Sequence, residues 1–244
     1  MAGIRLVHLS DIHVGRQYFS EELGEKVIHQ VNQMKPSCVI LSGDLTDDGY
    51  YHEYVEAKHY IDRIETENKV IIPGNHDSRN AGDKLFDELF GTRYPVCTSD
   101  GVKIVGVDST EPDLDDGHIG RIAYPLIKKN LSGEDFKIIV LHHHLIPIPD
   151  TGRERNIPVD AGDVLKLIAE LKVDLVLCGH KHVPWLWVLN DIIFLYAGTA
   201  TTLRIKAHIE QSYNYIELEP HKELKIYRIS SATGEKRLVY QRQL

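Results

Sequence analysis

Five short polar motifs occur in this sequence in a fixed order, and each follows an apolar run typical of a buried β-strand. They are Asp11-Ile-His13, Gly43-Asp44, Gly74-Asn75-His76-Asp77, His142-His143-His144 and Gly179-His180-Lys181-His182. In α/β proteins, ligands bind beyond the carboxyl ends of the strands, because loops from several strands converge there. We therefore expect these side chains, which are far apart in sequence, to meet in one site of an α/β fold.

Short β-branched runs alternate with helical patterns through the first three-quarters of the chain, which predicts strand–helix–strand crossovers. The predicted strands of this part are Arg5–Leu9, Cys38–Leu41, Val70–Ile72, Val102–Val107, Phe136–Leu141 and Asp174–Cys178. The predicted helices are Ser20–Met34, Gly49–Ile64 and Asp160–Leu171. The alternation indicates a mainly parallel α/β layer.

The pattern after His182 is strand-like, without a long helix. The predicted strands are Trp185–Leu189, Ile192–Tyr196, Tyr213–Leu218, Leu224–Ile229 and Leu238–Tyr240. We interpret this part, residues 185–244, as a mainly antiparallel second sheet. Because no repeat or Gly/Ser linker divides the 244 residues, we expect a single domain over 1–244, with its motifs in 8–182.

Composition narrows the classes of partner. The formal net charge is −8 and no block rich in Lys or Arg occurs, which favours a small substrate over a nucleic-acid polymer. The odd number of cysteines, Cys38, Cys97 and Cys178, and the lack of a Cys-x-x-Cys pair favour reduced thiols in a cytoplasmic protein. No apolar stretch approaches about 20 residues, and the first residues are too weakly apolar for a signal peptide, so we expect no membrane association.

The polar motifs supply carboxylates, an amide and several imidazoles. These groups suit Mn²⁺, Fe²⁺/Fe³⁺, Zn²⁺ or Co²⁺, and an adjacent pair of such ions typically performs phosphate chemistry. Each motif alone has an ordinary explanation, such as a polar turn or a hydrogen-bonded histidine at a strand end. The occurrence of all five in order favours a site for two divalent metal ions.

The ordered motifs resemble the calcineurin-like metallophosphoesterase superfamily, whose pattern is Asp-x-His, Gly-Asp, Gly-Asn-His-Asp/Glu, His and Gly-His-x-His. The resemblance implies an α/β (α+β) fold, a four-layer αββα sandwich of two facing mixed sheets flanked by helices. It also implies a set of metal ligands: Asp11, His13 and His182 for the first ion, Asn75, His142 and His180 for the second, and Asp44 bridging both. His76 would be the catalytic histidine, with Asp77 orienting it.

The family pattern requires one histidine after the strand Phe136–Leu141, and this chain has three. His142 directly follows the strand and is the expected ligand. His143 is the alternative ligand and a candidate substrate-binding residue, whereas we expect His144 to line the pocket or pack locally.

Other residues are weaker candidates. Arg79 could steer a phosphate or be a solvated turn residue, and Arg16 offers the same two readings. The segment from Pro147 to Arg155 suits a lid or substrate-selecting wall, with Arg153 and Arg155 as charges, or is an ordinary connector. The acidic residues Asp47, Asp48 and those at 113–116 are predicted to be solvated loop charges.

We expect a phosphodiesterase that hydrolyses a small diester by in-line attack of metal-bound hydroxide. The stretches 43–54 and 90–95 look like the bacterial and archaeal branch that includes class III cyclic-nucleotide and glycerophosphodiester hydrolases. A nucleotide or protein phosphomonoesterase is the main alternative.

Residues 8–15 are similar to the opening of DNA-repair nucleases, but the net charge opposes this reading. His76 opposes a non-catalytic scaffold of the retromer-subunit type. A homodimer contact through Trp185 and Trp187 is a further hypothesis.

Overall fold

The computed structural model describes residues 3–15, 18–152, 154–206 and 208–244, and its described strands form two six-stranded sheets. The first sheet contains β1 (Ile4–Leu9), β2 (Cys38–Ser42), β3 (Lys69–Ile72), β10 (Ser212–Glu219), β11 (Glu223–Ser230) and β12 (Lys236–Gln243). Its strand order is β12-β11-β10-β1-β2-β3. The strands β1, β2 and β3 are parallel, and β10, β11 and β12 continue the sheet with antiparallel pairing.

The second sheet has the order β4-β5-β6-β7-β9-β8. Its strands are β4 (Val96–Ser99), β5 (Val102–Gly106), β6 (Phe136–Val140), β7 (Leu175–Cys178), β8 (Trp185–Leu189) and β9 (Ile192–Tyr196). The four central strands β5, β6, β7 and β9 are parallel, and the two edge strands are antiparallel to their neighbours.

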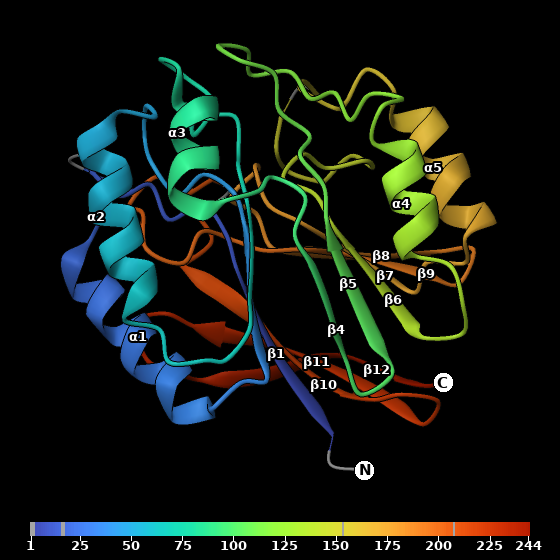
Figure 1. Cartoon of the computed structure of the whole chain (residues 1–244). Coiled ribbons are helices and arrows are strands. Elements are labelled where there is room, and N and C mark those ends of the chain that lie inside the picture. Colours follow the sequence, from blue (N-terminus) through green and yellow to red (C-terminus); the bar gives the residue numbers. More distant parts are fainter. Residues whose placement is uncertain (1–2, 16–17, 153, 207) are drawn as a thin grey trace.

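Helices cover the outer faces of the sandwich. They are α1 (Glu21–Met34), α2 (Tyr51–Asp62), α3 (Gly82–Phe90), α4 (Tyr124–Asn130) and α5 (Ala161–Glu170). Figure 1 shows α1, α2 and α3 on one side, α4 and α5 on the other, and the sheets between them. The predicted four-layer αββα sandwich is therefore confirmed. No helix in the described part of the chain is both long and apolar enough to cross a membrane.

The strands that carry the motifs are buried on both faces, which explains their continuous apolar runs. Successive side chains of a strand point to opposite faces of the sheet. In β1, Val7 and Leu9 pack beneath the helices, whereas Leu6 packs between the two sheets. In β6, Ile139 packs beneath α4 and α5, and Ile138 packs between the sheets. A one-residue shift in register would exchange these two environments, so the burial pattern fixes where each strand ends.

The prediction that residues 185–244 form the second sheet is wrong. The strands β8 and β9 join the sheet of β4 to β7, whereas β10, β11 and β12 join the sheet of β1 to β3. Alternating apolar residues indicate an antiparallel strand, but both parallel layers offer an open edge that such a strand can join. The helices α3 and α4 and the strand β4 are short, and the sequence patterns do not predict them. The predicted elements are otherwise present, with their ends shifted by at most three residues.

The glycines of the motifs sit where two loops touch. A Cβ atom on Gly74 would overlap both the backbone nitrogen and the carboxylate of Asp44. A Cβ atom on Gly179 would overlap the hydroxyl of Ser10. Close contact between the loops thus requires glycine at both positions, because any side chain would push the loops apart.

We predict that Gly74→Ala lowers the free energy of unfolding by about 2 kcal/mol, because overpacking of a buried contact typically costs about 1–3 kcal/mol. Gly162→Ala is the matched control, since a Cβ there meets no atom within 4 Å and Gly162 lies in α5. The control should leave stability unchanged or raise it slightly. Urea denaturation of both variants measures the difference, and equal stability of the two would contradict the proposed contact.

Candidate metal centre

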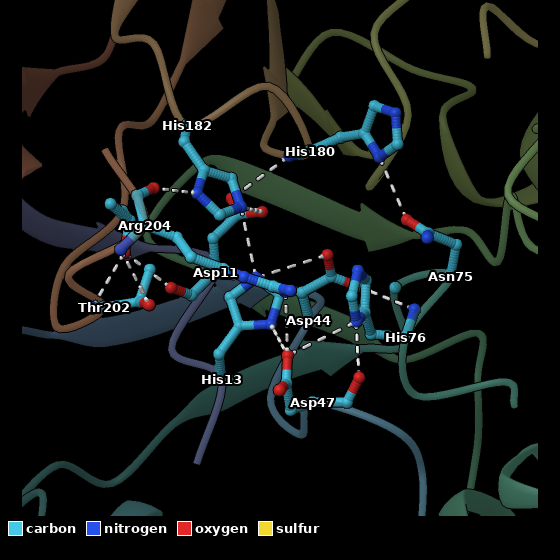
Figure 2. A network of polar contacts seen from close by, with 12 residues as sticks. Asp11, His13, Asp44, Asp47, Asn75, His76, His180, His182, Thr202 and Arg204 are labelled. Atoms are coloured by element: carbon cyan, nitrogen blue, oxygen red, sulfur yellow. Dashed lines mark hydrogen bonds and ion pairs between the residues drawn. The ribbon is translucent and has the colours of Figure 1, made fainter. Parts of the chain in front are cut away.

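The motif residues converge beyond the carboxyl ends of β1, β2, β3, β6 and β7. Figure 2 shows side chains from the loops after β1, β2, β3 and β7 gathered near Asp44. Two of the possible ligand groups contain only buried residues: Asp11, His13, Asp44 and His182 in one, and Asp44, His142 and His180 in the other. Within each group the ligand atoms lie within 4.8 Å of one another. The structure therefore brings the expected ligand residues together.

The first group contains two imidazole nitrogens that face each other. Nε2 of His13 lies 3.1 Å from Nε2 of His182, and the same His182 nitrogen lies 3.2 Å from Oδ1 of Asp11. Ligand atoms about 2.0–2.2 Å from one metal ion lie about 3 Å apart, so these separations suit ligands of a shared ion. Oδ1 of Asp11 is buried and has no hydrogen-bond partner in the described residues, which leaves a carboxylate lone pair for a cation.

The second group is arranged around the amide oxygen of Asn75. This oxygen lies 3.1 Å from Nε2 of His142 and 3.0 Å from Nδ1 of His180. Nδ1 of His142 lies 2.8 Å from the carbonyl oxygen of Ser42, so it can donate to that carbonyl. In this tautomer Nε2 is unprotonated and can serve as a ligand.

Asp44 stands between the two groups. Its Oδ1 lies 3.4 Å from Nε2 of His142, and its Oδ2 lies 3.7 Å from Nε2 of His13. The backbone N–H of His76 donates a hydrogen bond of 3.0 Å to Oδ1, which fixes the orientation of the carboxylate. One oxygen of Asp44 thus faces each group, as a carboxylate that bridges two cations requires.

Five of the seven expected ligands have a left-handed backbone. Their φ angles are 53° at Asp11, 52° at His13, 52° at Asp44, 72° at His180 and 56° at His182. Such conformations are uncommon outside glycine and concentrate at functional sites. Loop–loop hydrogen bonds hold them: the N–H groups of Asp11 and His13 donate to the carbonyl oxygens of Gly43 and Asp44, both at 3.0 Å. The backbone is therefore bent at these positions to aim several side chains inward.

The electrostatics of the cluster suit a cation. Burial opposes ionisation of Asp44, but the neighbouring His142 and His76 hold its pKa well below the usual range. Burial also opposes protonation of His142, yet the carboxylates of Asp44 and Asp11 raise its pKa to about 9. Burial together with neighbouring histidines holds the pKa of His180 well below its ordinary value. Two buried carboxylates and a neutral imidazole thus offer lone pairs to one small region, and the residues fit divalent metal ions.

His76 lies at the edge of this cluster, with 15% of its side chain exposed. Its Nδ1 is 2.5 Å from the carbonyl oxygen of Asp47, and its ring packs edge-on against His13 with 4.7 Å between the ring centroids. Asp77 lies elsewhere: its carboxylate accepts hydrogen bonds from the N–H groups of Leu45, at 3.0 Å, and Gly74, at 2.9 Å. The expected role of Asp77 in orienting the ring is therefore wrong. Asp77 joins two loops, and the Asp47 carbonyl contacts His76.

Asp47 belongs to the site, although its sequence context predicted a solvated loop charge. It is only 4% exposed, its Oδ1 lies 3.3 Å from Nδ1 of His13, and Arg204 approaches the same oxygen at 3.1 Å. A carboxylate next to the second nitrogen of a ligand histidine fixes the ring and increases its basicity. The only sequence signal was its position three residues after Asp44.

Asp115 is exposed, as predicted for a loop charge, but it also contacts two residues of the site. Nδ2 of Asn75 donates a 3.0 Å hydrogen bond to its Oδ1, and Nη2 of Arg79 approaches the same atom at 2.6 Å. The bond to Asp115 turns the Asn75 amide so that its oxygen points toward His142 and His180. Arg79 also lies near His76, with 2.9 Å between Nη1 and Nδ1. Arg79 is thus beside the cluster, as expected for a residue that contacts substrate.

The other two residues of the histidine run are buried. Nδ1 of His143 lies 2.9 Å from the hydroxyl of Ser109, and its Nε2 lies 3.2 Å from the carbonyl oxygen of Asp115. His143 is fully buried, as His142 is, and both of its ring nitrogens face protein atoms, so its expected substrate-binding role stays a prediction. His144 packs locally, as one of its two expected roles required: its Nε2 lies 2.7 Å from Glu154.

The segment after the histidine run covers one side of the cluster. Lys181 approaches Glu154 at 3.2 Å and donates a 2.9 Å hydrogen bond to the carbonyl oxygen of Arg155. Glu154 therefore ties the segment to the motif that contains Lys181, which suits the predicted substrate-selecting wall. Two residues considered from the sequence, Arg16 and Arg153, lie outside the described residues.

A cavity of about 390 Å³ opens onto the cluster. Its walls are formed by Asp44, Asn75, His76, Asp115, Asn156, His180, Lys181, His182, Arg204, Ile205 and Lys206. The segment of Arg204 and Lys206 was not predicted to reach the site, because its residues lie beyond the last motif and follow no predicted element. The cavity is large enough for a small ligand and has cationic side chains on its walls.

Comparisons with known proteins agree with this geometry. Over 231 residues the chain is 28% identical to a probable cyclic nucleotide phosphodiesterase of Rhodococcus erythropolis, covering 87% of this chain and 71% of that protein. It is 26% identical over 214 residues to a probable glycerophosphodiester phosphodiesterase of Arcobacter nitrofigilis, covering 80% and 77%.

A purple acid phosphatase from yellow lupin has the same fold, with a TM-score of 0.77 at 15% identity. The match covers 99% of this chain but 54% of the lupin chain, so this chain spans about half the length of that phosphatase. The sequence profile described as calcineurin-like phosphoesterase matches residues 4–184, which is most of the chain and includes all five motifs. The chain therefore belongs to the calcineurin-like phosphoesterase family.

Proposed function

We propose that this protein is a phosphodiesterase that hydrolyses a small phosphodiester with two divalent metal ions. Family membership and the buried cluster support divalent-metal binding. The single observation that supports a pair of ions is the position of Asp44, whose two oxygens face two separate groups of ligands. When bound, such ions polarise a phosphoryl group and lower the pKa of water. We also propose that the chain acts as one domain, since β10 pairs directly with β1.

In this proposal His76 acts on the leaving group. Because its Nδ1 lies against the Asp47 carbonyl, Nδ1–H donates there and Nε2 is left for chemistry. A protonated Nε2 can donate its proton to the leaving oxygen as the bond to phosphorus breaks. Arg79, held beside His76, would contact a nonbridging oxygen of the phosphate.

The charges on the wall favour a diester over a monoester. Arg79 is paired with Asp115, and Arg204 is paired with Asp47. These pairs leave less positive charge for a dianionic monoester, whereas a diester carries a single negative charge. The two bacterial relatives named above are both described as phosphodiesterases, of a cyclic nucleotide and of a glycerophosphodiester. We propose a substrate of one of these two classes, with Mn²⁺, Fe²⁺/Fe³⁺, Zn²⁺ or Co²⁺ as the metal ions.

The first prediction concerns substrate class. Mn²⁺-loaded protein should hydrolyse bis-p-nitrophenyl phosphate with a kcat/KM at least tenfold higher than that for p-nitrophenyl phosphate, because Arg79, Arg204 and Lys181 on the wall are each paired with a carboxylate. Release of p-nitrophenol measures both rates, and protein treated with a chelator is the control. A preference for the monoester would show instead that the site is that of a phosphomonoesterase.

The second prediction concerns His76. His76→Asn should lower kcat for the diester by about 10²–10⁴-fold, the usual contribution of a general acid. Its metal content should not change, because the hydrogen bond to Asp44 comes from the backbone of residue 76. His52→Asn, at an exposed position in α2, is the matched control. Turnover at the wild-type rate in His76→Asn would remove His76 from the mechanism.

The third prediction concerns the orientation of the Asn75 amide. Asp115→Ala removes the acceptor of the Nδ2 hydrogen bond and should weaken binding of one metal ion by about 10–100-fold, as is typical for partners of metal ligands. Isothermal titration of metal-free protein with Mn²⁺ measures this affinity. Asp116→Ala, a neighbouring acidic residue, is the control. If the two variants bind Mn²⁺ equally well, Asp115 has no part in positioning Asn75.

A further inference from the structure

A second groove lies away from the metal centre, between the open edges of the two sheets. The strand β12 is the edge of the first sheet, and β8 is the edge of the second. The wider part of the groove, about 580 Å³, is lined by residues of both edges, among them Trp185, Leu186, Leu238 and Val239. A narrower part of about 300 Å³ shares Ile209, Arg228 and Arg237 with the wider part. The described lining of both parts contains no residue of the metal cluster.

Two arginines lie side by side on one wall of this groove. Arg228 on β11 and Arg237 on β12 are directly paired in the antiparallel register, so their side chains lie on the same face of the sheet. Within the described part of the chain, neither guanidinium makes a hydrogen bond or an ion pair. Arg242, farther along β12, does have a partner, since it donates a 2.7 Å hydrogen bond to the carbonyl oxygen of Asp191. Like charges directly opposite each other destabilise a sheet, and an anion between them would remove that cost.

Arg228 is also partly withdrawn from solvent. Burial, together with the charge of Arg237, lowers the pKa of Arg228 to about 10. Its Nε is buried and has no acceptor among the described residues. Acidic side chains are present in the walls, namely Glu210 and Glu235 in the narrower part and Asp150 in the wider part, but none is within ion-pair distance of either arginine. The two positive charges are therefore not neutralised within the described chain.

The wall of the groove also contains a buried hydroxyl group. Ser212 lines the narrower part of the groove, is 5% exposed, and its Oγ has no hydrogen-bond partner in the described residues. Buried polar atoms normally have a partner, so the unpaired Oγ of Ser212 and Nε of Arg228 leave this end of the groove unsatisfied within the described chain. The wider part adds an apolar wall, to which Trp185, Leu186 and Leu238 contribute.

We propose that this groove binds a phosphomonoester that carries a flat aromatic ring, such as a nucleoside monophosphate. The phosphate dianion matches the two unpaired positive charges, and guanidinium groups bind phosphate oxygens through paired hydrogen bonds. The apolar wall to which Trp185 contributes offers a surface against which the aromatic ring can pack. The site is separate from the proposed active site and does not depend on its chemistry.

Trp185 lines the groove and is one of the two tryptophans of the chain, so intrinsic fluorescence can report binding there. The full chain is titrated with AMP, with adenosine and with inorganic phosphate while tryptophan emission is recorded. We expect a saturable change with AMP, and at least tenfold weaker binding of adenosine, which lacks the dianion, and of phosphate, which lacks the ring.

Arg228→Gln and Arg237→Gln should each weaken AMP binding at least tenfold, whereas the control Arg242→Gln should bind like the wild type. Diester hydrolysis should be unchanged in all three variants, which shows that they are folded and separates this test from that of the active site. If Arg228→Gln does not fold, Arg237→Gln, at an exposed position, decides the question. An AMP response that persists in Arg237→Gln, or adenosine binding as tight as AMP binding, would overturn the proposal. A fluorescence response that arises from self-association of the chain, as detected by sedimentation velocity, would also overturn the proposal.

Discussion

The site depends on one buried carboxylate that is shared by two groups of ligands. Asp44 has no solvent to stabilise its charge, and its two oxygens face His142 on one side and His13 on the other. A buried anion in this position requires positive charge nearby, which a protonated His142 or a bound cation can supply. Bound cations satisfy this requirement and at the same time bring phosphate chemistry to the cavity. The same carboxylate therefore connects the electrostatics of the cluster with its proposed function.

The surrounding fold keeps Asp44 in place at a cost in backbone strain. Left-handed residues at the ends of β1, β2 and β7 aim the ligands inward, and glycine contacts such as Gly74 against Asp44 let the loops approach closely. Asp77 joins the loops after β2 and β3 through backbone hydrogen bonds at both. Strain of this kind persists only where the surroundings determine the conformation, and here two sheets buried on both faces do so.

The residues that the sequence singles out as ligands lie together in the fold, because each motif carries both its polar residues and the strand that places them. The sequence failed where a role depends on contacts between distant loops. Asp47 and Asp115 are acidic loop residues by pattern, and only the fold shows that they contact His13 and Asn75. The sheet joined by β10 was mispredicted for the same reason, since alternation reveals an antiparallel strand but not the edge it joins. His143 repeats the chemistry of His142, and only their contacts distinguish the two: Nε2 of His142 faces Asn75, whereas Nε2 of His143 faces the carbonyl oxygen of Asp115.

The most direct test of the central claim is anomalous diffraction from crystals of the Mn²⁺-loaded protein. The account predicts two manganese peaks about 3.5–4 Å apart, with one oxygen of Asp44 bound to each. One peak should lie beside Asp11 and His182, and the other beside Asn75 and His142. A single peak, or two peaks of which only one contacts Asp44, would contradict the claim that this carboxylate bridges a pair of ions.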